Sequence, residues 1–454
     1  CPGPSCGDCS LEQYRSVAFD LQLLHGEQAS VHSGVANGGT ATPFGLLMVT
    51  RSQSTVLDPA ADAAALLRRI GFAMLVVAVP VAALVTRRAA VVMEPIGVAL
   101  LVMAALLDGQ ARMLATVRRI VTSRAGLALL MLVAWAGLSL IWTRFPSTGG
   151  NKLVNIVGAI VLALAGTAAL PERVRSSNLY LTGIGVAAAA VLAIALAMID
   201  RPDDDPDATA SLGRGLAGLA LMVWPALAWL VSRQRNTLAL ALSAVAAVAV
   251  VAGTMPMAIL AFAISAFIFG LTSIRPNIGI RVVSWGMAGI ILAAPFMPFV
   301  LQPLVKLALG VAHPWTETMR AWTSIVRADP LRLITGYGFD ASLRGRVAGE
   351  IPMSAPIGLP FEIWYELGLV GAVSLALALG WAAQRAAAAH AVLVPGIAAA
   401  LTAGFVLACM GAGTAIAWWV TTLSITAIAF VAIERGQFRT SRPKARLWMA
   451  ANDR

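Results

Sequence analysis

Charged residues are scarce in this sequence: Asp, Glu, Lys and Arg make up only 12% of 454 residues, whereas hydrophobic residues make up 59%. A soluble globular domain carries about 25% charged residues. The shortage excludes an ordinary soluble enzyme and predicts an integral membrane protein with many spans. The net charge of +11 would favour nucleic acid as the partner of a soluble protein. Here the basic residues lie in short loops between apolar runs, so membrane topology explains most of them.

Cysteine and histidine are also rare, with four residues of each. Three of the cysteines, Cys1, Cys6 and Cys9, lie at the start of the chain. Cys6-Gly-Asp-Cys9 is a lone CxxC without a second pair nearby, so it indicates zinc or a redox site only weakly. The sequence contains no histidine cluster that would favour a metal site. We therefore expect neither a metal nor another cofactor.

Residues 1–66 differ from the rest of the chain and are expected to lie outside the membrane. They are rich in Gly, Ser and Pro, show no sustained hydrophobic period and lack the pattern of a signal peptide. The chain begins with Cys, and Met48 opens a more ordinary leader. We expect that translation starts at Met48 and that residues 1–47 are not a native domain. N-terminal sequencing of the natively expressed protein tests this hypothesis.

Apolar runs of the length that a helix needs to cross a bilayer, about 20 residues, begin at Ile70. About twelve such runs predict an all-α polytopic membrane protein, with nine spans in 67–309, one large periplasmic loop at 310–360 before the tenth span, and three spans in 361–433. The predicted spans are 70–86, 89–107, 125–142, 153–170, 179–199, 213–231, 237–253, 256–273, 282–309, 361–383, 391–410 and 414–433. Prolines and Lys306 near the end of the 282–309 run predict that this end is kinked or lies in the membrane interface.

Positive charge alternates between the predicted loops. Arginines are frequent in every second loop and in the tail 434–454, which the positive-inside rule assigns to the cytoplasm. The acidic segment 200–207 then lies outside. Three basic segments fall outside against the rule: Arg87-Arg88, the loop of Arg144 and Lys152, and residues 310–360. An outer cation needs another reason, and an anionic ligand is one.

The long loop contains an amphipathic segment. Over residues 316–327 the apolar residues recur at helical spacing, while Arg320, Ser324 and Arg327 fall on another face. This pattern predicts a short helix that lies over the membrane domain with a cationic stripe. An interfacial helix with snorkelling arginines is the alternative. Further along, Gly336-Tyr337-Gly338 predicts a tight turn that brings backbone N–H groups close to a ligand.

Charged residues at the predicted helix ends are the other candidates. Glu362 and Glu366 lie four residues apart, on one helix face at the outer mouth of the tenth span. Carboxylates in that setting either mark function or pair with a loop cation. Arg214 opens the sixth span, at a helix N-terminus that favours anions. Glu94 precedes Pro95 inside the second span, as a functional group or as a structural pair at a kink.

Three motifs carry a resemblance to a known family. The first is Arg214-Gly-Leu-Ala with the apolar run that follows to Pro225. The second is Arg320-Ala-Trp, followed by Asp329-Pro330 and by Gly336-Tyr337-Gly338. The third is FEIWYELGLVG at 361–371. Over residues 70–433 the chain resembles the O-antigen ligase and O-antigen polymerase superfamily of bacterial envelope glycan transferases. The histidine position of that family is occupied by Ile357, and Glu362 replaces the family's glutamine.

The resemblance implies a metal-independent glycosyltransferase at the periplasmic face of the bacterial inner membrane. The donor is a glycan on undecaprenyl pyrophosphate, and the acceptor is lipid A–core or a growing glycan. The catalytic candidates are Glu366, Glu362 and His313. The substrate-binding candidates are Arg214, Arg320, Arg327, Tyr337, Arg344 and Trp364. For the pyrophosphate, Arg327, Arg344 and also Arg346 rank behind Arg214 and Arg320. Because guanidinium groups bind phosphate oxygens in a fork, we expect Arg214 and Arg320 to converge on one outward cavity that holds the pyrophosphate.

Two other classes of function stay open. The first is a non-catalytic relative that binds a lipid-linked glycan, which Ile357 at the histidine position favours. The second is a secondary transporter or flippase, which would use charges inside the membrane and a repeat symmetry about the midplane. The sequence shows no clear two-fold repeat, and its predicted midplane holds few charges beyond Glu94.

Overall fold

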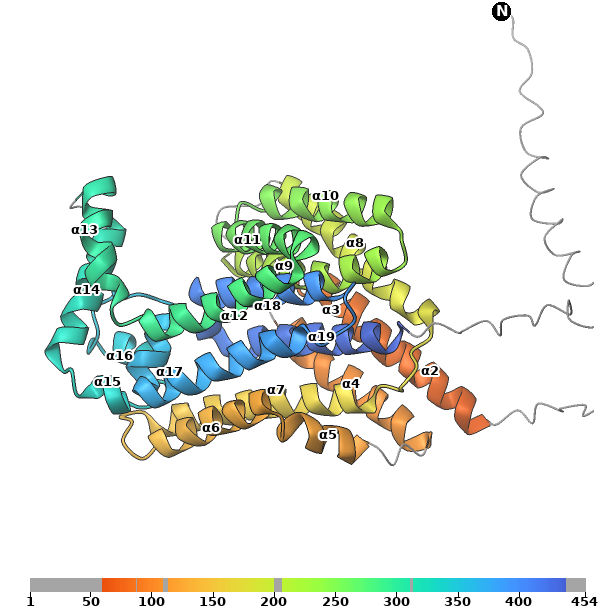
Figure 1. Cartoon of the computed structure of the whole chain (residues 1–454), viewed down its shortest axis with the longest axis horizontal. Helices are drawn as coiled ribbons and strands as arrows, with labels where there is room; N and C mark the ends of the chain where they lie inside the picture. The colour runs from red at the N-terminus through yellow and green to blue at the C-terminus, as the bar shows by residue number, and fades with distance from the viewer. Residues whose placement is uncertain (1–58, 87, 109–112, 200–205, 311–312, 438–454) are drawn as a thin grey trace, which may run out of the picture. The chain divides into compact units, whose positions relative to one another are not determined.

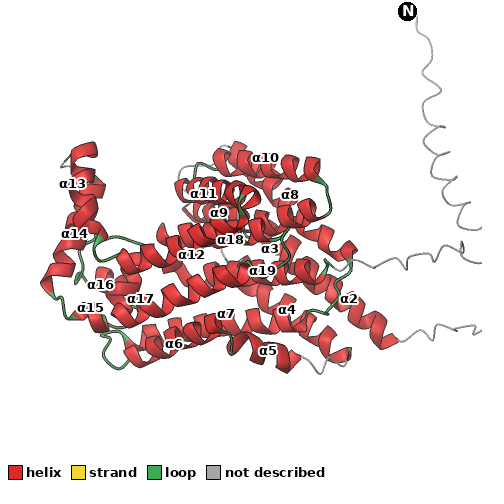
Figure 2. Cartoon of the chain, in the orientation of Figure 1, coloured by secondary structure: helices red, strands yellow, loops and turns green. Residues whose placement is uncertain are grey.

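The computed structural model describes residues 59–86, 88–108, 113–199, 206–310 and 313–437. In these ranges the chain is helical and contains no strand (Figure 2), which confirms the all-α prediction. They belong to a compact unit that runs from Leu57 to Arg454. The CxxC pair, the expected start at Met48 and most of the basic tail lie outside the described residues.

The helices follow one another with short connections in the first half of the chain. Their bounds are α2 Pro59–Ala73, η1 (a π-helix) Met74–Ala78, α3 Val79–Ala82, α4 Ala89–Leu107, α5 Met113–Val121, α6 Arg124–Ser139, α7 Pro146–Ala169, α8 Ser176–Met198 and α9 Pro206–Ser232.

The second half of the chain contains the long segment between α12 and α17, which holds the short helices α13 to α16. The bounds in this half are α10 Asn236–Ala252, α11 Pro256–Ile274, α12 Pro276–Ala293, α13 Met297–Leu309, α14 Pro314–Ala328, α15 Arg332–Thr335, α16 Ala341–Val347, α17 Leu359–Ala386, α18 Val394–Cys409, η2 (a 3-10 turn) Ala412–Ala415 and α19 Ile416–Arg435. Figure 1 shows α15 and α16 beside the N-terminal half of α17, and α13 packed on α14 farther away.

Several of these helices are long and apolar enough to cross a bilayer. Among the described residues eight meet this condition, and a ninth span arises if the bent pair α5 and α6, at 74° to each other, is counted as one. The predicted number of about twelve is therefore not confirmed by length and composition; α10 and α18, for example, are shorter apolar helices. The first span begins at Pro59, earlier than the predicted Ile70, because the Ala-rich stretch before Ile70 is a strong helix former.

The predicted span 282–309 is wrong as a single unit. The chain forms α12 and α13 instead, with a break at residues 294–296 that contains Pro295. A proline there lacks the N–H that would continue the helical hydrogen bonds. Only 13 residues long, α13 leaves apolar side chains exposed, such as Val300 at 62% and Leu307 at 87%. The kink expected from the prolines is thus a complete helix break.

The centre of the fold is α9. Helices α8, α10, α11, α18 and α19 surround it, and its Trp224 and Trp229 side chains are fully buried. The Trp224 ring lies within 5.7 Å of the rings of Phe262 and Phe269 on α11. The outer helices expose large apolar side chains, including Leu240 at 73% and Phe267 at 69%. Water would disfavour such a surface, whereas a hydrocarbon surrounding accommodates it, as expected for a membrane-embedded protein.

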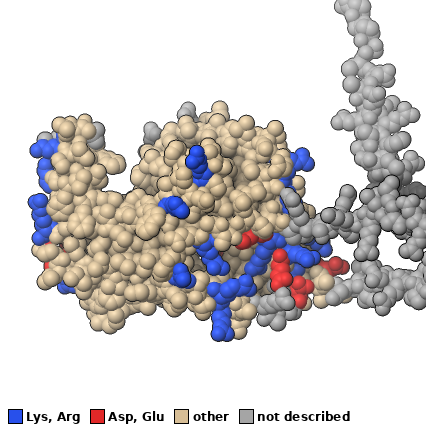
Figure 3. All heavy atoms as spheres, in the orientation of Figure 1, with Lys and Arg blue, Asp and Glu red and all other residues tan. Residues whose placement is uncertain are grey.

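Charged groups gather at the two ends of the helices. In the view of Figure 3, Lys and Arg side chains cluster near α13 and α14 and near α2 and α5, and most of the surface between is uncharged. At the α2 end, Arg68 pairs with Asp108 at 2.5 Å, and Arg233 donates to Ser176 and to Gly436 O, both at 2.9 Å. Loops predicted to share one side of the membrane therefore lie together.

Candidate functional site

The helix α17 is broken at Gly368, where the backbone has φ 61° and ψ −154°. A break leaves the carbonyls just before it without their helical donors. Two N–H groups of the predicted turn replace those donors: Tyr337 donates to Tyr365 O at 2.8 Å and Gly338 to Glu366 O at 2.9 Å. The turn is confirmed, but the expectation that these two N–H groups meet a ligand is wrong, because α17 uses them.

The turn approaches α17 closely because it carries no side chain at its first position. A Cβ on Gly336 would lie 2.2 Å from Glu366 O. The third freed carbonyl, Leu367 O, accepts a hydrogen bond from Trp135 Nε1 of α6 at 2.9 Å. The N-terminal half of α17, residues 359–367, is therefore fixed by donors from two separate parts of the chain.

Lys152 of α7 lies between two carboxylates. Its Nζ is 3.1 Å from Asp340 Oδ1 and 3.9 Å from Glu366 Oε1. The Ser342 hydroxyl donates to the same Glu366 oxygen, and the Ser342 backbone N–H does so at 3.3 Å. The Arg344 Nε atom lies 3.5 Å from Asp340 Oδ2. Thus Glu366, the first catalytic candidate, has one oxygen already held by Lys152 and Ser342, and the substrate candidate Arg344 pairs with Asp340.

Lys152 belongs to this charged cluster, and the motifs do not identify it as a candidate. Its signal in the sequence is that it is the single charged residue of α7, and an ion in an apolar helix is a functional hypothesis by default. The sequence groups it with Arg144 as an outer cation that needs an anionic ligand. The structure gives both a partner in the same loop segment, since Arg144 pairs with Glu350 at 2.6 Å. That hydrogen bond raises the pKa of Arg144.

Glu362 and Arg346 are buried with incomplete hydrogen bonding. Each residue is 9% exposed. Among the described residues, Glu362 Oε1 and Arg346 Nη1 have no hydrogen-bond partner. The other end of the guanidinium is fixed, because Arg346 Nη2 donates to Pro356 O and the group lies 5.9 Å from the centre of the Phe361 ring. Burial lowers the pKa of Arg346, and the charge of Glu362 opposes this shift.

An aromatic stack covers the other side of the N-terminal half of α17. The Tyr337 and Tyr365 rings are stacked at 4.5 Å, Phe361 follows at 5.4 Å from Tyr365, and Trp322 of α14 meets Phe361 edge-on at 5.8 Å. The Arg332 guanidinium lies 5.4 Å from the Tyr337 ring. Burial raises the pKa of Tyr337. The substrate candidate Tyr337 is therefore a structural contact between the turn and α17 as well as part of a pocket wall.

Trp364, another substrate candidate, is buried. It is 8% exposed, and its Nε1 donates to Ile291 O at 2.7 Å. That carbonyl lies in the last turn of α12, where helical donors run out. The bond ties α17 to the end of α12, and the ring also lines the pocket beside the aromatic stack.

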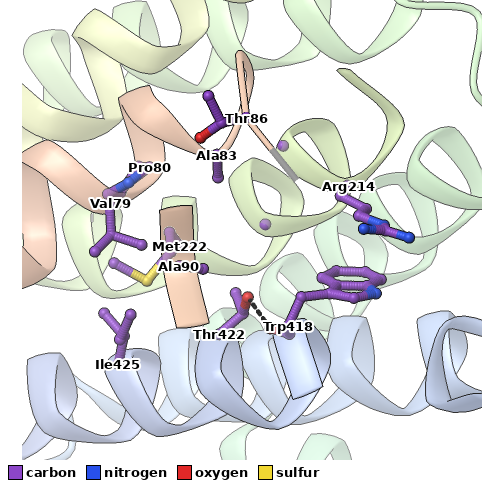
Figure 4. Close-up of a pocket in the computed structure, with 12 residues that line it drawn as sticks. Val79, Pro80, Ala83, Thr86, Ala90, Arg214, Met222, Trp418, Thr422 and Ile425 are labelled. Carbon is purple, nitrogen blue, oxygen red and sulfur yellow. Dashed lines mark hydrogen bonds between the residues drawn. The ribbon is translucent and has the colours of Figure 1, made fainter. Parts of the chain in front are cut away.

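Arg214 lines a different pocket, formed by α3, α4, α9 and α19. Its lining is apolar apart from Arg214 and a few hydroxyl and indole groups. Figure 4 shows Arg214 and Trp418 at one edge of the pocket, and Met222 and Ile425 at the other. On α19, the Thr422 hydroxyl donates to Trp418 O at 2.7 Å. The pocket therefore combines an apolar side with a cationic edge.

The helix α14 confirms the amphipathic segment predicted in the long loop. It exposes Arg320 and Arg327, and the Arg327 guanidinium lies 5.2 Å from the Phe299 ring of α13. The third catalytic candidate, His313, caps the helix, since its Nδ1 accepts from the Trp315 backbone N–H at 3.3 Å. In the structure His313 is therefore the N-cap residue of α14.

Arg214 and Arg320 belong to different parts of the fold. Arg214 lines the pocket among α3, α4, α9 and α19, whereas Arg320 lies on α14 and lines neither this pocket nor the one beside the aromatic stack. Their convergence on one pyrophosphate stays a prediction.

Comparisons with known proteins add no family to this geometry. Within the described part of the chain, no group of three His, Cys, Asp or Glu side chains is placed to hold a metal ion. No protein-family model, no curated protein and no solved structure matches the chain. The chain is a helical, membrane-embedded protein, and its function is inferred from the residues of its own pockets.

Proposed function

We propose that this chain is a glycosyltransferase of the O-antigen ligase or polymerase type. It moves a glycan from undecaprenyl pyrophosphate to a hydroxyl group of an envelope glycan or of lipid A–core. The reaction takes place at the periplasmic face of a bacterial inner membrane. About twelve spans, a cytoplasmic C-terminus and a large periplasmic loop at 310–360 belong to the same proposal.

The observation that carries the proposal is the apolar pocket with Arg214 at its edge. Its lining offers apolar contacts and one cation, the groups that a ligand with an apolar chain and an anionic head requires. A polyprenyl pyrophosphate has both parts. In glycosyl transfer the departing pyrophosphate gains negative charge, which a permanently charged guanidinium stabilises. Arg214 therefore has a role both in binding the donor and in the departure of the pyrophosphate.

The carboxylates of α17 supply the second part of the mechanism. Glu366 is hydrogen-bonded to Ser342 and lies near Lys152, so it suits a positioning role. Glu362 keeps a buried oxygen without a described partner, so it suits the role of proton acceptor. We accordingly rank Glu362 ahead of Glu366. Ile357, at the position of the family's histidine, offers no group for proton transfer.

Replacing Arg214 tests the proposal. Deletion of the gene in its natural host, followed by complementation, reports on the length and attachment of surface polysaccharide. We expect Arg214→Met to lower transfer at least tenfold, while Arg385→Met, at the far end of α17 and exposed, leaves it unchanged. Unaltered surface glycans in the deletion strain would exclude the proposed function.

A flippase or transporter is the second candidate, because α4 buries a carboxylate. Glu94 is 1% exposed, and its Oε1 has no hydrogen-bond partner among the described residues. Glu94 lies one turn after Ala90, which lines the Arg214 pocket. Reconstituted vesicles separate the two candidates: a flippase moves lipid-linked glycan across the bilayer without any transfer to an acceptor, and Glu94→Gln then abolishes that movement.

A further inference from the structure

Two incomplete ions lie beside each other at the start of α17. Glu362 is in the first turn of α17, and Arg346 is in the last turn of α16. The Arg346 guanidinium donates to Pro356 O and lies over the Phe361 ring. These two residues are on either side of Leu359, where α17 begins. The two charges influence each other, yet no ion pair joins them among the described residues. Each is nine-tenths buried and has one polar atom without a partner.

Such atoms are unusual in a folded interior. Buried polar groups are almost always hydrogen-bonded, and an unpaired buried charge costs several kcal/mol. The neighbouring carboxylates do not share the deficit, because Asp340 and Glu366 are paired with Lys152. Among the described charged groups around the start of α17, the unpaired buried atoms are one acceptor, Glu362 Oε1, and one donor, Arg346 Nη1. A single group that donates to the carboxylate and accepts from the guanidinium would complete both.

The chemistry of that group follows from the two atoms. It must donate a hydrogen bond to a carboxylate and accept one from a guanidinium. Phosphate and carboxylate anions satisfy Arg346 but are repelled by Glu362, and an ammonium group satisfies Glu362 but cannot accept from Arg346. A neutral hydroxyl does both, since it carries one donor and two acceptor lone pairs.

We propose that Glu362 and Arg346 form a site for one hydroxyl group of a saccharide acceptor. Its O–H donates to Glu362 Oε1, and its oxygen accepts from Arg346 Nη1. This inference rests on the proposed function and extends it, because it places the acceptor hydroxyl at the start of α17.

The site supports a balanced transfer step. The bound hydroxyl oxygen forms a bond to the anomeric carbon of the donor glycan, and the hydroxyl proton passes to Glu362. The bond between that carbon and the pyrophosphate oxygen breaks, and its electron pair leaves with the pyrophosphate. Arg346 holds the oxygen in line, and Lys152 is a positioning residue that keeps Asp340 and Glu366 in place.

The test measures acceptor binding apart from transfer. Wild-type protein and the variants Glu362→Gln, Glu362→Asp and Arg346→Gln are reconstituted with polyprenyl-pyrophosphate-linked glycan from the host. The acceptor probe is a fluorescently labelled oligosaccharide released from the host envelope. Glu350→Gln is the matched control, since this carboxylate lies in the same loop but is exposed and paired with Arg144. Thermal stability and monodispersity are recorded for every variant, and Glu362→Asp keeps the charge if Glu362→Gln fails to fold.

We expect Glu362→Gln to lower the rate constant of transfer about 10²–10⁴-fold, the usual value of positioned proton transfer, with donor binding unchanged. Arg346→Gln raises the Kd of the oligosaccharide at least tenfold, and Glu350→Gln changes neither. Normal transfer and normal oligosaccharide binding in both Glu362→Gln and Arg346→Gln overturn the hydroxyl site and leave the proposed function intact. A wild-type protein that does not bind the oligosaccharide also overturns it. Binding that depends on both residues, without any transfer, supports the site and rejects the glycosyltransferase.

Discussion

Two long helices of this protein, α9 and α17, are stabilised in opposite ways. In its membrane-spanning window, 83% of α9 is buried, against 50% of α17. The tryptophans of α9, Trp224 and Trp229, are fully buried, and their indole nitrogens have no hydrogen-bond partner among the described residues. At the N-terminal half of α17, by contrast, Trp135 and Trp364 both donate hydrogen bonds.

The difference suggests that α9 supports the fold, whereas α17 holds the residues of the candidate site in place. The continuous helix α9 is fixed by the shapes of its neighbours, and helix packing in a bilayer depends on such contacts. The interrupted helix α17 is fixed by named donors and acceptors, which hold side chains and carbonyls in set positions. A site needs this second kind of support, because a displacement of about 1 Å is enough to impair catalysis.

The largest expected effect comes from a glycine in α17 compared with one in α9. Gly368→Ala places a Cβ 2.5 Å from Ile334 O at φ 61°, so we expect a loss above the roughly 1–3 kcal/mol of backbone strain alone. Gly218→Ala in α9 places its Cβ 3.7 Å from Thr422 and should be neutral or stabilising. Unfolding in bicelles measures both, and equal effects would contradict the role of the break.

A second comparison uses the tryptophans. Trp135→Phe leaves Leu367 O without its donor, which should cost about 1–3 kcal/mol. Trp224→Phe removes an indole N–H that has no described partner, so its cost should be smaller. The free energies of unfolding of the two variants decide the matter, and a larger loss for Trp224→Phe refutes the distinction between the helices.

A smaller effect is expected where α17 meets α12 beyond the break. The Ser284 hydroxyl donates to Gly380 O at 3.1 Å, and interhelical hydrogen bonds in membranes are worth about 0.6 kcal/mol. Ser284→Ala should lose about that amount. Ser243→Ala is the control, because its hydroxyl bonds only to Leu240 O of its own helix and is exposed. Indistinguishable stabilities would show that this bond does not support α17.

The smallest effect concerns the Arg144–Glu350 pair at the edge of the site. The Arg144 side chain is 74% exposed, and exposed pairs of this kind contribute little. Arg144→Gln should therefore change neither the melting temperature nor the transfer rate. A loss of transfer without a loss of stability would assign Arg144 to a ligand after all.

The sequence predicts α14 and the neighbouring turn correctly because their signals are local. Apolar residues around Met319 and Trp322 recur at the helical period, and Gly336 and Gly338 permit the positive φ angles of the turn, 75° and 100°. Glu362 and Glu366 also emerge from local spacing. Which of them has a partner is not a local matter, since Ser342 and Lys152 reach Glu366 from 24 and 214 residues away (366 − 342 and 366 − 152).

The break at Gly368 has no comparable local signal. A glycine inside an apolar run is compatible with a continuous helix, as Gly218 in α9 shows. The break depends on donors from the turn and from α6, which a period of 3.6 residues does not encode. Lys152 is not among the predicted site residues for a related reason. The positive-inside rule assigns each cation to one side of the membrane, whereas Lys152 is explained by the two carboxylates that it contacts, Asp340 and Glu366.

The hydrogen bonds at the break also bear on how the chain is made. A carbonyl without a donor is costly in hydrocarbon, and α17 presents three of them, at Tyr365, Glu366 and Leu367. Trp135 and the turn at 336–338 both precede α17 in the sequence, so all three donors leave the ribosome before the helix that needs them. We therefore expect the order of synthesis to make all three donors available before α17 is inserted. In a circular permutant that begins after the turn, α17 is made first. Its three carbonyls would then enter the bilayer without hydrogen-bond donors.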